Sequence, residues 1–362
     1  MRIAQLISVG VTNGAARHGL AVSAELARRG HAVVLFHRRW LDLAAAQAAG
    51  VCCIEWGFEL SPRGLRALRR RFAEHGVEVA HVHTSKAHAI AAALRLLGGP
   101  PVVATAHAQH LQLPWALTDL VIAPSEAAAS YHRRVNLVAR RRMRLVPSFI
   151  GAQRFDPPTP DRRRAARERL GVAAGALLVG QVADIHFDKR QSDLVAAGAS
   201  LQARWPNLRV ALKGAPVNAL ELARIETARG GRDDLLVHDE DRDQVGLFLD
   251  ALDIFAVTSV REVGPLCALE AMSAGLPVVG TQVGRLPELL GDQAAGLLVR
   301  PRDRAALVAA IDRLAAHPQD AARMGAAARA QALCRVDDAG AFDAIEAVLA
   351  EAAALKPQPR RA

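Results

Sequence analysis

The sequence predicts an α/β protein built from two doubly wound, Rossmann-like domains. Three observations favour this fold class. With 362 residues, the chain exceeds the ~250–300 residues over which one hydrophobic core usually grows. Short apolar runs alternate along it with Ala-, Leu- and Arg-rich stretches of helical length, the order expected for parallel sheets covered by helices. Residues 155–161 contain three prolines and lack the periodic spacing of apolar residues typical of a helix or strand, and they interrupt this alternation near its middle.

Strands are predicted where apolar residues follow one another without alternation, because strands of a parallel sheet are buried on both faces. In the first half they cover 3–8, 32–36, 79–83, 102–106, 120–123 and 145–147. In the second half they cover 177–182, 210–213, 235–238, 254–257 and 278–281. The longer stretches between them predict helices, among them 15–29, 86–97, 190–204 and 304–316. Since open α/β sheets bind ligands at the carboxyl ends of their strands, we expect the site between the two halves.

The composition excludes several classes of protein. Apolar residues make up 51% and charged residues 23%, which is globular rather than disordered composition. Aromatic residues make up only 4%, which disfavours stacking on single-stranded nucleic acid. The four cysteines form neither a disulfide framework nor a CxxC zinc motif, and they favour a reducing cytosol. The apolar opening, residues 3–11, is shorter than the ~20 residues of a membrane span, so neither a span nor a signal peptide is expected.

The basic excess lies entirely in the first part of the chain. Residues 1–150 hold 19 Lys and Arg against 8 Asp and Glu, a net charge of +11, while the remainder holds 27 against 28, a net charge of −1. The arginines cluster around 63–71 and 133–144. Such clusters can bind an anionic membrane surface or the phosphates of a nucleic acid, and the alternative is an ordinary solvated face.

The strongest local pattern begins where a strand is expected to end, near Thr258. Pro265 suits the first turn of the next helix, where the missing N–H costs nothing. The amides of Gly264, Leu266 and Cys267, together with the helix dipole, would then form an anion site. A carboxylate about 7 Å further along this helix, at 1.5 Å per residue, would accept both hydroxyls of a ribose whose diphosphate lies on the helix start.

That carboxylate is Glu270, and Glu262 precedes it by eight positions with seven residues between them. Ala-Met, Gly-Leu-Pro-Val-Val and Gly-x-x-Pro-Glu elements follow, all within residues 259–288. This block resembles the E-x7-E segment of the family 4 retaining glycosyltransferases, which have the GT-B fold. The resemblance implies that Glu270 contacts the ribose of a nucleotide-sugar and that Glu262 contacts its sugar.

The resemblance extends over residues 1–350 and implies a domain organisation. Residues 1–155 would form a Rossmann-like domain that binds the acceptor, and residues 156–335 one that binds the nucleotide-sugar, with a cleft between them. Residues 336–355 would form a helix that packs back on the first domain. The reaction would retain the anomeric configuration by front-face attack, without a protein base, a metal or another cofactor. The expected donor is a UDP-sugar.

Segments of the first domain resemble other parts of this family. Asn13-Gly14 leading into a helix resembles the family's glycine loop, although the loop usually carries two glycines. Thr105-Ala106-His107 resembles the strand end with the active-site histidine, and His83 lies in a similar position at the end of an earlier strand. The pairs His81-x-His83 and His107-x-x-His110 have no carboxylate nearby in sequence, so a zinc site is not expected.

The segment after the strand that ends at Gln181 resembles the phosphate-binding loop of the family. Lys189 fits the lysine that opens the next helix, but Gln181 stands where the family carries an arginine. A glutamine cannot supply that positive charge, so Lys189, Arg190 or Lys213 compensates, or donor affinity is weak. The acidic run 238–243 contains Asp-x-Asp, and we interpret Asp239 or Asp241 as a helix N-cap rather than a metal ligand.

The resemblance thus implies transfer of a hexose-type sugar to a glycan or lipid-linked acceptor in the biosynthesis of lipopolysaccharide, O-antigen or another cell-envelope polysaccharide. Glu262 and His107 are the expected catalytic residues. The expected donor-binding residues are Gly14, Lys189, Arg190, Lys213, Gly264, Leu266, Cys267 and Glu270. Arg63, Arg66 and Arg70 are expected to face the acceptor or an anionic membrane, which places the protein in the cytoplasm or on the inner face of the cytoplasmic membrane.

Three alternatives remain open at this point. The first is a catalytically impaired family member that still binds nucleotide-sugars, with Gln181 as its sign. The second is a nucleotide-sugar epimerase of similar fold. The third is a non-catalytic protein that binds membranes or nucleic acid through its arginines, although a nucleic-acid partner is not expected because neither a helix-turn-helix nor aromatic interleaving is present.

Overall fold

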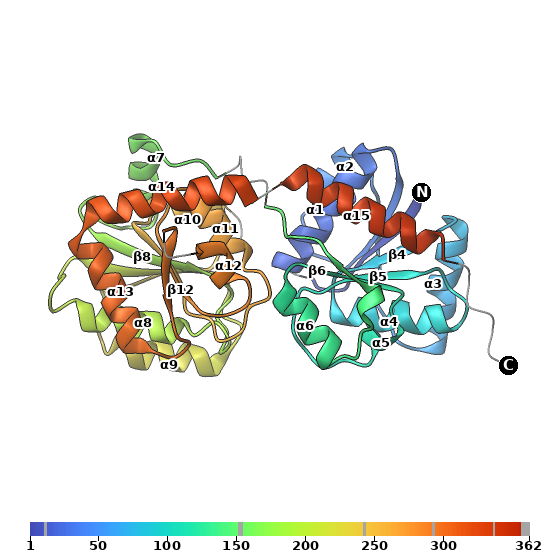
Figure 1. Ribbon diagram of the computed structural model, residues 1–362, viewed down its shortest axis with the longest axis horizontal. Helices are drawn as coiled ribbons and strands as arrows, with labels where there is room; N and C mark the ends of the chain where they lie inside the picture. Colours follow the sequence, from blue (N-terminus) through green and yellow to red (C-terminus); the bar gives the residue numbers. More distant parts are fainter. Residues whose placement is uncertain (11–12, 151–154, 242–243, 292–293, 336, 356–362) are drawn as a thin grey trace. The chain divides into compact units, whose positions relative to one another are not determined.

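The computed structural model describes residues 1–10, 13–150, 155–241, 244–291, 294–335 and 337–355 (Figure 1). The chain divides into two compact units. The first comprises Met1–Ser148 together with the segment that begins at Asp338, and the second comprises Phe149–Asp337. Each unit is a parallel sheet covered by helices, which confirms the predicted fold class.

The first unit contains a seven-stranded sheet of order β3-β2-β1-β4-β5-β6-β7. All neighbouring strands pair in parallel. The order reverses direction between β1 and β4, and ligands of doubly wound sheets bind at such a switch point. The strands are β1 (Arg2–Ile7), β2 (Ala32–His37), β3 (Cys52–Glu55), β4 (Val79–Val82), β5 (Val102–Thr105), β6 (Leu120–Ala123) and β7 (Met143–Leu145).

Helices cover both faces of this sheet. Figure 1 shows α1, α2 and α15 on one side and α3, α4, α5 and α6 on the other. Their bounds are α1 (Gly14–Arg28), α2 (Ala44–Ala48), α3 (Pro62–Glu74), α4 (Ser85–Leu96), α5 (Pro114–Leu117) and α6 (Glu126–Arg134), with a 3-10 turn at Arg140–Arg142 and α15 (Asp338–Ala353).

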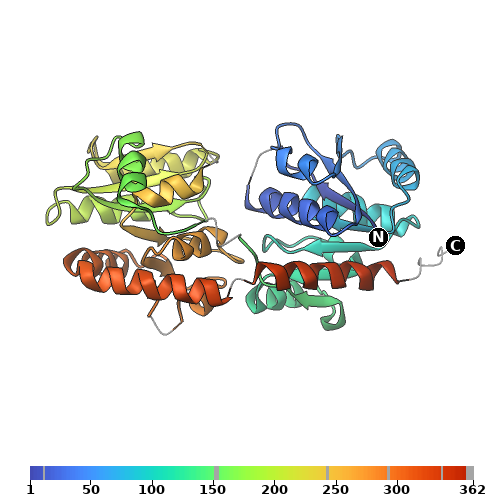
Figure 2. The same ribbon diagram turned by 90° about the horizontal axis from the view of Figure 1, so that it is seen from above.

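The last helix, α15, belongs to the first unit although almost the whole second unit precedes it in sequence. Figure 2 shows it in red along this unit. It packs on α1 and on β4, β5 and β6, with Ile345, Val348 and Leu349 buried. Glu346 anchors the middle of the helix, because its carboxylate accepts hydrogen bonds from Arg29 Nη1 (3.0 Å) and His31 Nε2 (2.8 Å).

The second unit contains a six-stranded parallel sheet of order β10-β9-β8-β11-β12-β13. The strands are β8 (Leu177–Val182), β9 (Leu208–Lys213), β10 (Leu236–Asp239), β11 (Ile254–Val257), β12 (Val278–Thr281) and β13 (Gly296–Val299). The helices are α7 (Pro160–Arg169), α8 (Gln191–Leu201), α9 (Ala219–Arg229), α10 (Val245–Ala251), α11 (Leu266–Ser273), α12 (Leu286–Leu290), α13 (Arg304–Ala316) and α14 (Pro318–Arg335).

The continuous apolar runs of these strands are explained by two separate cores. Leu178 and Phe255 join the core beneath α10, α11 and α14, whereas their neighbours Val179 and Ile254 join the core beneath α8 and α13. Since successive residues of a strand point to opposite faces, both must be apolar when both faces are covered.

The helix α7 is anchored to this unit by arginines. The guanidinium of Arg167 is buried and donates to the carbonyls of Ala251 (3.0 Å) and Ala176 (3.0 Å) and to the Asp253 carboxylate (2.7 Å). Arg163 on the same helix also pairs with Asp253. These bonds fix α7 against the loop that leads from α10 to β11.

Candidate functional site

The helix α11 begins just beyond the carboxyl end of β11. Pro265 is its N-cap, with φ −70° and ψ 100°, and the first helical residue is Leu266, so Pro265 lies one position before the predicted first turn. The first hydrogen bond of the helix runs from the Ala268 N–H to the Pro265 carbonyl (3.1 Å). The N–H groups of Leu266 and Cys267 precede that bond, at the positive end of the helix dipole.

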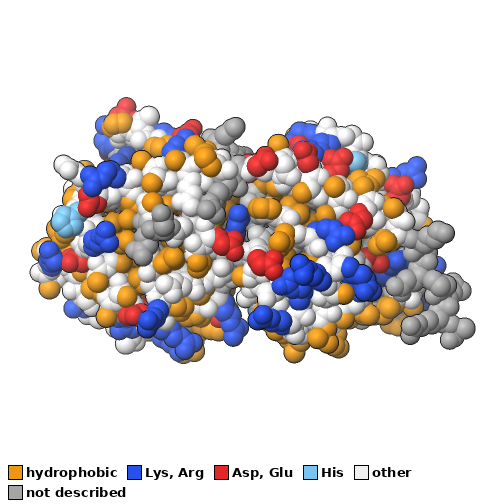
Figure 3. All heavy atoms as spheres, in the orientation of Figure 1, with side chains coloured by type: hydrophobic (Ala, Val, Ile, Leu, Met, Phe, Trp, Pro, Cys, Tyr) orange, Lys and Arg blue, Asp and Glu red, His pale blue; other side chains and the backbone are white. Residues whose placement is uncertain are grey.

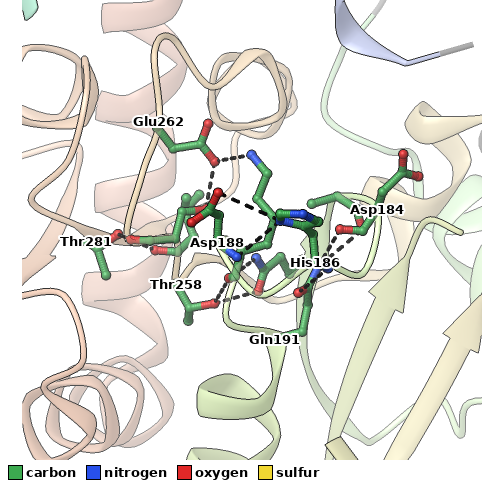
Figure 4. Close-up of polar contacts among 12 residues, drawn as sticks. Asp184, His186, Asp188, Gln191, Thr258, Glu262 and Thr281 are labelled. Carbon is green, nitrogen blue, oxygen red and sulfur yellow. Dashed lines mark hydrogen bonds and ion pairs between the residues drawn. The ribbon is translucent and has the colours of Figure 1, made fainter. Parts of the chain in front are cut away.

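Glu270 lies one turn into α11 and is buried, with 5% of its surface exposed. Glu262 lies in the loop before the helix. Ser259 Oγ donates to Glu262 Oε1 (2.7 Å), and Lys189 Nζ donates to the same oxygen (2.6 Å) (Figure 4). Lys189 and Glu262, which the sequence analysis assigned to different parts of a donor, therefore form an ion pair.

This ion pair determines the charge of Lys189. Burial alone would lower the pKa of its ammonium, but the carboxylate of Glu262 outweighs burial by its charge and its hydrogen bond, so the pKa is raised. Lys189 is therefore a firmly charged cation next to the start of α11. An ammonium has three donors, and the bond to Glu262 uses one of them.

The loop that carries Lys189 is tied to the end of β11. Gln181 Nε2 donates to the Lys189 carbonyl (3.1 Å), and Thr258 Oγ1 lies 2.9 Å from Gln181 Oε1 and 2.8 Å from the same carbonyl. The Val260 N–H donates to the Asp188 carbonyl (2.8 Å). Gln181 is buried and positions the loop that carries Lys189. The sequence analysis noted only that Gln181 stands in place of an arginine and did not predict this role.

The remainder of this loop is braced by its own side chains, as Figure 4 shows. Gln191 Nε2 donates to the Asp184 carbonyl (3.0 Å), and the Asp184 carboxylate accepts from the Ala215 N–H (3.1 Å). Arg190, the residue after Lys189, adopts a left-handed backbone with φ 54° and pairs with Asp193 (2.8 Å). The hydrogen bond from Arg190 to that carboxylate raises the arginine's pKa.

A glycine also shapes the Glu262 loop. Gly284 has φ +55°, and a Cβ at this position would lie 2.4 Å from the Glu262 carbonyl oxygen. A side chain would therefore displace the loop or strain the backbone. This close approach explains the glycine of the Gly-x-x-Pro-Glu element.

Lys213 is held inside this unit, and one expectation about the acidic run is wrong. Lys213 is only 1% exposed, and its Nζ donates to Asp239 Oδ2 (2.8 Å) and lies 5.8 Å from the centre of the Phe248 ring, so its charge is used inside the unit. Neither Asp239 nor Asp241 is a helix N-cap. Asp239 ends β10, and α10 begins at Val245 with Gln244 as its N-cap.

In the first unit, Gly14 is the first residue of α1, and Asn13 caps this helix by accepting from the Ala16 N–H (3.0 Å). His107 follows β5, and His83 follows β4. The two rings approach each other with His83 Nδ1 3.4 Å from His107 Nε2. Burial lowers the pKa of His107 to about 4, so its imidazole is neutral at pH 7.

The segment after His107 is held by a polar network that the sequence analysis missed. Asn136 Oδ1 accepts from the Gln112 N–H (2.8 Å), and Asn136 Nδ2 donates to the His110 carbonyl (2.9 Å) and to His132 Nδ1 (3.0 Å). His132 Nε2 donates to the Ala108 carbonyl (3.1 Å). Burial lowers the pKa of His132 to about 4, which keeps the neutral form that this pattern requires.

Arg63, Arg66 and Arg70 lie on the exposed face of α3, while Leu68 and Phe72 of the same helix are buried. On the face of the first unit that Figure 3 shows, basic side chains lie among acidic and apolar ones. No helix among the described residues is long and apolar enough to cross a membrane.

Lys189, Arg190, Glu262 and the helix α11 with Glu270 all belong to the second unit, and an ion pair joins Lys189 to Glu262. Gly14 and His107 lie in the first unit. A site shared by both groups remains a prediction.

Comparisons with known proteins agree with this architecture. The model described as "Glycosyltransferase Family 4" matches residues 12–154, and the model described as "Glycosyl transferases group 1" matches residues 162–331. D-inositol 3-phosphate glycosyltransferase of Saccharomonospora viridis is 33% identical over 60% of this chain and 52% of its own length. The enzyme of that name from Streptomyces avermitilis is 31% identical over 66% of this chain and 53% of its own. The chain spans about half the length of these curated relatives.

Solved structures cover nearly the whole chain. The structure of Anabaena Alr3699/HepE in complex with UDP and glucose has a TM-score of 0.85 at 20% identity, over 97% of this chain and 99% of that one. WaaG, a glycosyltransferase involved in lipopolysaccharide biosynthesis, has a TM-score of 0.76 at 16% identity, over 96% and 99%. With one family model on each half of the chain and whole-chain neighbours of the same architecture, the protein belongs to the family 4 glycosyltransferases and has the GT-B fold.

Proposed function

We propose that this protein is a retaining glycosyltransferase that moves a hexose-type sugar from a UDP-sugar to a hydroxyl of a glycan or lipid-linked acceptor. One observation carries the proposal: the charged Lys189 lies 2.6 Å from Glu262, which belongs to the loop that precedes α11. A lysine and a helix N-terminus together bind the diphosphate of a nucleotide-sugar.

Each donor group has an assigned partner in this proposal. The amides around Gly264 to Cys267 and the Lys189 ammonium contact the diphosphate. Glu270, buried one turn into α11, accepts the ribose hydroxyls. Glu262 accepts a hydrogen bond from a hydroxyl of the sugar, while its contacts with Ser259 and Lys189 fix its position.

The chemistry is positioning and charge stabilisation. The bond between the anomeric carbon and the diphosphate oxygen breaks, the acceptor oxygen bonds to that carbon from the same face, and the leaving diphosphate takes the acceptor's proton. Lys189 and the α11 amides stabilise the departing negative charge. His107 is neutral at pH 7 and acts as a hydrogen-bonding partner of the sugar rather than as an acid.

The relatives support the choice of donor and acceptor. The Anabaena neighbour is known in complex with UDP and glucose, which supports UDP as the nucleotide. Relatives act on an inositol phosphate or take part in lipopolysaccharide biosynthesis, which supports a polar or lipid-linked acceptor and a role in cell-envelope polysaccharide synthesis.

The test is thermal unfolding with UDP, GDP, ADP or TDP, without added metal. At 100 times its Kd a nucleotide stabilises the native state by about 2.7 kcal/mol, or about 5–10 °C for a domain of this size. We expect UDP to give this shift in wild type and in Glu226→Ala, an exposed control, but not in Glu270→Ala. Lys189→Gln should weaken UDP binding about 10- to 150-fold, the loss of a charged hydrogen bond.

A nucleotide shift that survives Glu270→Ala, or no shift with any nucleotide, would contradict the donor site. Release of UDP from UDP-sugars in the presence of acceptors then measures turnover, and NMR of the anomeric proton of the product tests retention. UDP-sugar binding without turnover on any acceptor would identify the impaired family member instead.

Membrane association is tested separately with vesicles that contain anionic lipid. About 1 kcal/mol per basic residue near the surface predicts that Arg63→Gln, Arg66→Gln and Arg70→Gln together weaken binding about 100-fold or more. The control replaces three exposed arginines of the second unit: Arg232, Arg302 and Arg313. Equal binding by both triple variants would refute a role for α3.

A further inference from the structure

Three histidines from separate elements converge at the carboxyl edge of the first sheet. His18 lies on α1, His83 directly follows β4, and His107 follows β5. One ring nitrogen of each lies within 4.8 Å of the other two. His18 and His83 are buried and His107 is half-buried. The sequence pairs His81-x-His83 and His107-x-x-His110 did not predict this set, because His18 lies far from both in sequence.

The hydrogen bond of His83 fixes which of its nitrogens is a ligand. His83 Nε2 lies 2.7 Å from the side-chain oxygen of Gln5 on β1, and an amide oxygen only accepts hydrogen bonds. Nε2 therefore carries the proton and Nδ1 presents its lone pair toward His107 Nε2. An outer partner that orients the ring through its second nitrogen is the usual support of a metal-binding histidine.

The spacing of the ring nitrogens fits a tetrahedral ion. Two nitrogens bound to zinc at about 2.0–2.1 Å with tetrahedral angles lie about 3.3–3.4 Å apart. His83 Nδ1 and His107 Nε2 are 3.4 Å apart. All three ring nitrogens lie within 4.8 Å of one another, so binding of one ion requires the rings to draw closer at the widest separation. Three neutral imidazoles then leave a fourth position for water or an anion.

The three rings are in the form that a metal requires. Burial is the main cause that lowers the pKa of His107 to about 4, and it holds the pKa values of His18 and His83 well below 6.5. All three are neutral at pH 7, as metal ligation demands.

A glycine allows α1 to approach this cluster. A Cβ on Gly19 would lie 2.9 Å from the ring of His83 and 2.8 Å from Ile7. Only a residue without a side chain lets the helix carry His18 this close to the end of β4.

We propose that His18, His83 and His107 bind one zinc ion, or another borderline divalent cation such as Co²⁺, with Gln5 as the outer partner of His83. The site itself does not depend on the proposed function. A consequence does: a bound ion occupies the His107 nitrogen that would contact the sugar, so zinc inhibits transfer.

The test titrates the full chain with Zn²⁺ by calorimetry and records the visible spectrum with Co²⁺, without nucleotide or sugar. We expect one ion per chain and a tetrahedral Co²⁺ spectrum without a thiolate band, since cysteines are not ligands. Gln5→Leu should weaken binding 10- to 100-fold, the effect of losing an outer partner. His83→Gln and His107→Gln should weaken it more.

His110→Gln is the matched control, because His110 is exposed, lies three positions after His107 and is not a member of the set. The proposal is overturned if wild type binds no Zn²⁺, if the ligand variants bind it as wild type does, or if the Co²⁺ spectrum shows thiolate. If His83→Gln is unfolded by circular dichroism, His107→Gln and the wild-type Co²⁺ spectrum decide.

Inhibition is measured as UDP release by wild type and His18→Gln with and without Zn²⁺. Zinc should inhibit wild type, a chelator should restore its rate, and His18→Gln should resist. Zinc binding without inhibition of an active enzyme would overturn the consequence for His107. An inactive protein that still binds zinc would count against the proposed function and not against the site.

Discussion

Replacing Asn136 by Ala tests whether the segment after His107 is held by one buried side chain. The substitution removes hydrogen bonds to the Gln112 N–H, the His110 carbonyl and His132 Nδ1. At about 0.5–1.5 kcal/mol each, these three bonds are worth about 1.5–4.5 kcal/mol. The first unit should therefore unfold at a temperature lower by about 2–4 °C for each kcal/mol lost.

The assay combines urea unfolding with hydrogen exchange of single amides. Asn136→Ala should speed exchange of the Gln112 amide, which loses its acceptor. Asn136→Asp keeps that oxygen and should protect Gln112, while it loses the donors to His110 and His132. Arg134→Ala, on the exposed surface of the same turn, should change stability by less than about 0.5 kcal/mol.

The reasoning is refuted if Asn136→Ala loses less than about 0.5 kcal/mol and leaves exchange of the Gln112 amide unchanged. A double-mutant cycle with His132→Ala should give a coupling of about 0.5–3 kcal/mol, because the two side chains share a hydrogen bond. A coupling near zero would mean that Asn136 acts alone.

Two further predictions concern the stability of the units. Arg167→Met should destabilise the second unit by about 3–5 kcal/mol, because buried carbonyls and Asp253 lose a donor, whereas Arg164→Met on the exposed side of α7 should cost less than about 0.5 kcal/mol in urea unfolding. The hydrogen bond from Arg29 is the largest cause that lowers the pKa of Glu346 below its ordinary value of 4.5, so the ionised carboxylate stabilises α15 at neutral pH and this contribution disappears as acid protonates it. Stability curves of wild type and Glu346→Gln should therefore differ at pH 7 and approach each other as the pH falls below 4.5 and through the lowered pKa; curves that stay parallel would contradict this account.

The fold could be predicted from the sequence where strands are buried on both faces. The ranges of β8, β11 and β12 agree with prediction, because two cores demand unbroken apolar runs. β3 was missed since it is a half-exposed edge strand with the sequence Cys-Cys-Ile-Glu, which shows no apolar run. β13 was missed because it begins with Gly296 and has only a short apolar run, Leu-Leu-Val, after it.

The candidate site was predicted as single residues rather than as contacts. The elements around Lys189 and Glu262 were evident, but their ion pair joins positions 73 apart, and no local pattern encodes it. Lys213 was named as one residue that could compensate for Gln181, but its ion pair with Asp239 on the neighbouring strand could not be predicted from the sequence. His18 was missed because only tertiary packing brings α1 beside β4.

The position of α15 has a consequence for how the chain folds during synthesis. The first unit is discontinuous: the ribosome makes residues 1–148 and then the whole second unit before it makes the helix that covers β4, β5 and β6. Until then, the surface that Ile345, Val348 and Leu349 bury must face solvent or a chaperone. The second unit, whose residues are contiguous in sequence, can therefore complete its folding before the first unit, whose synthesis began earlier.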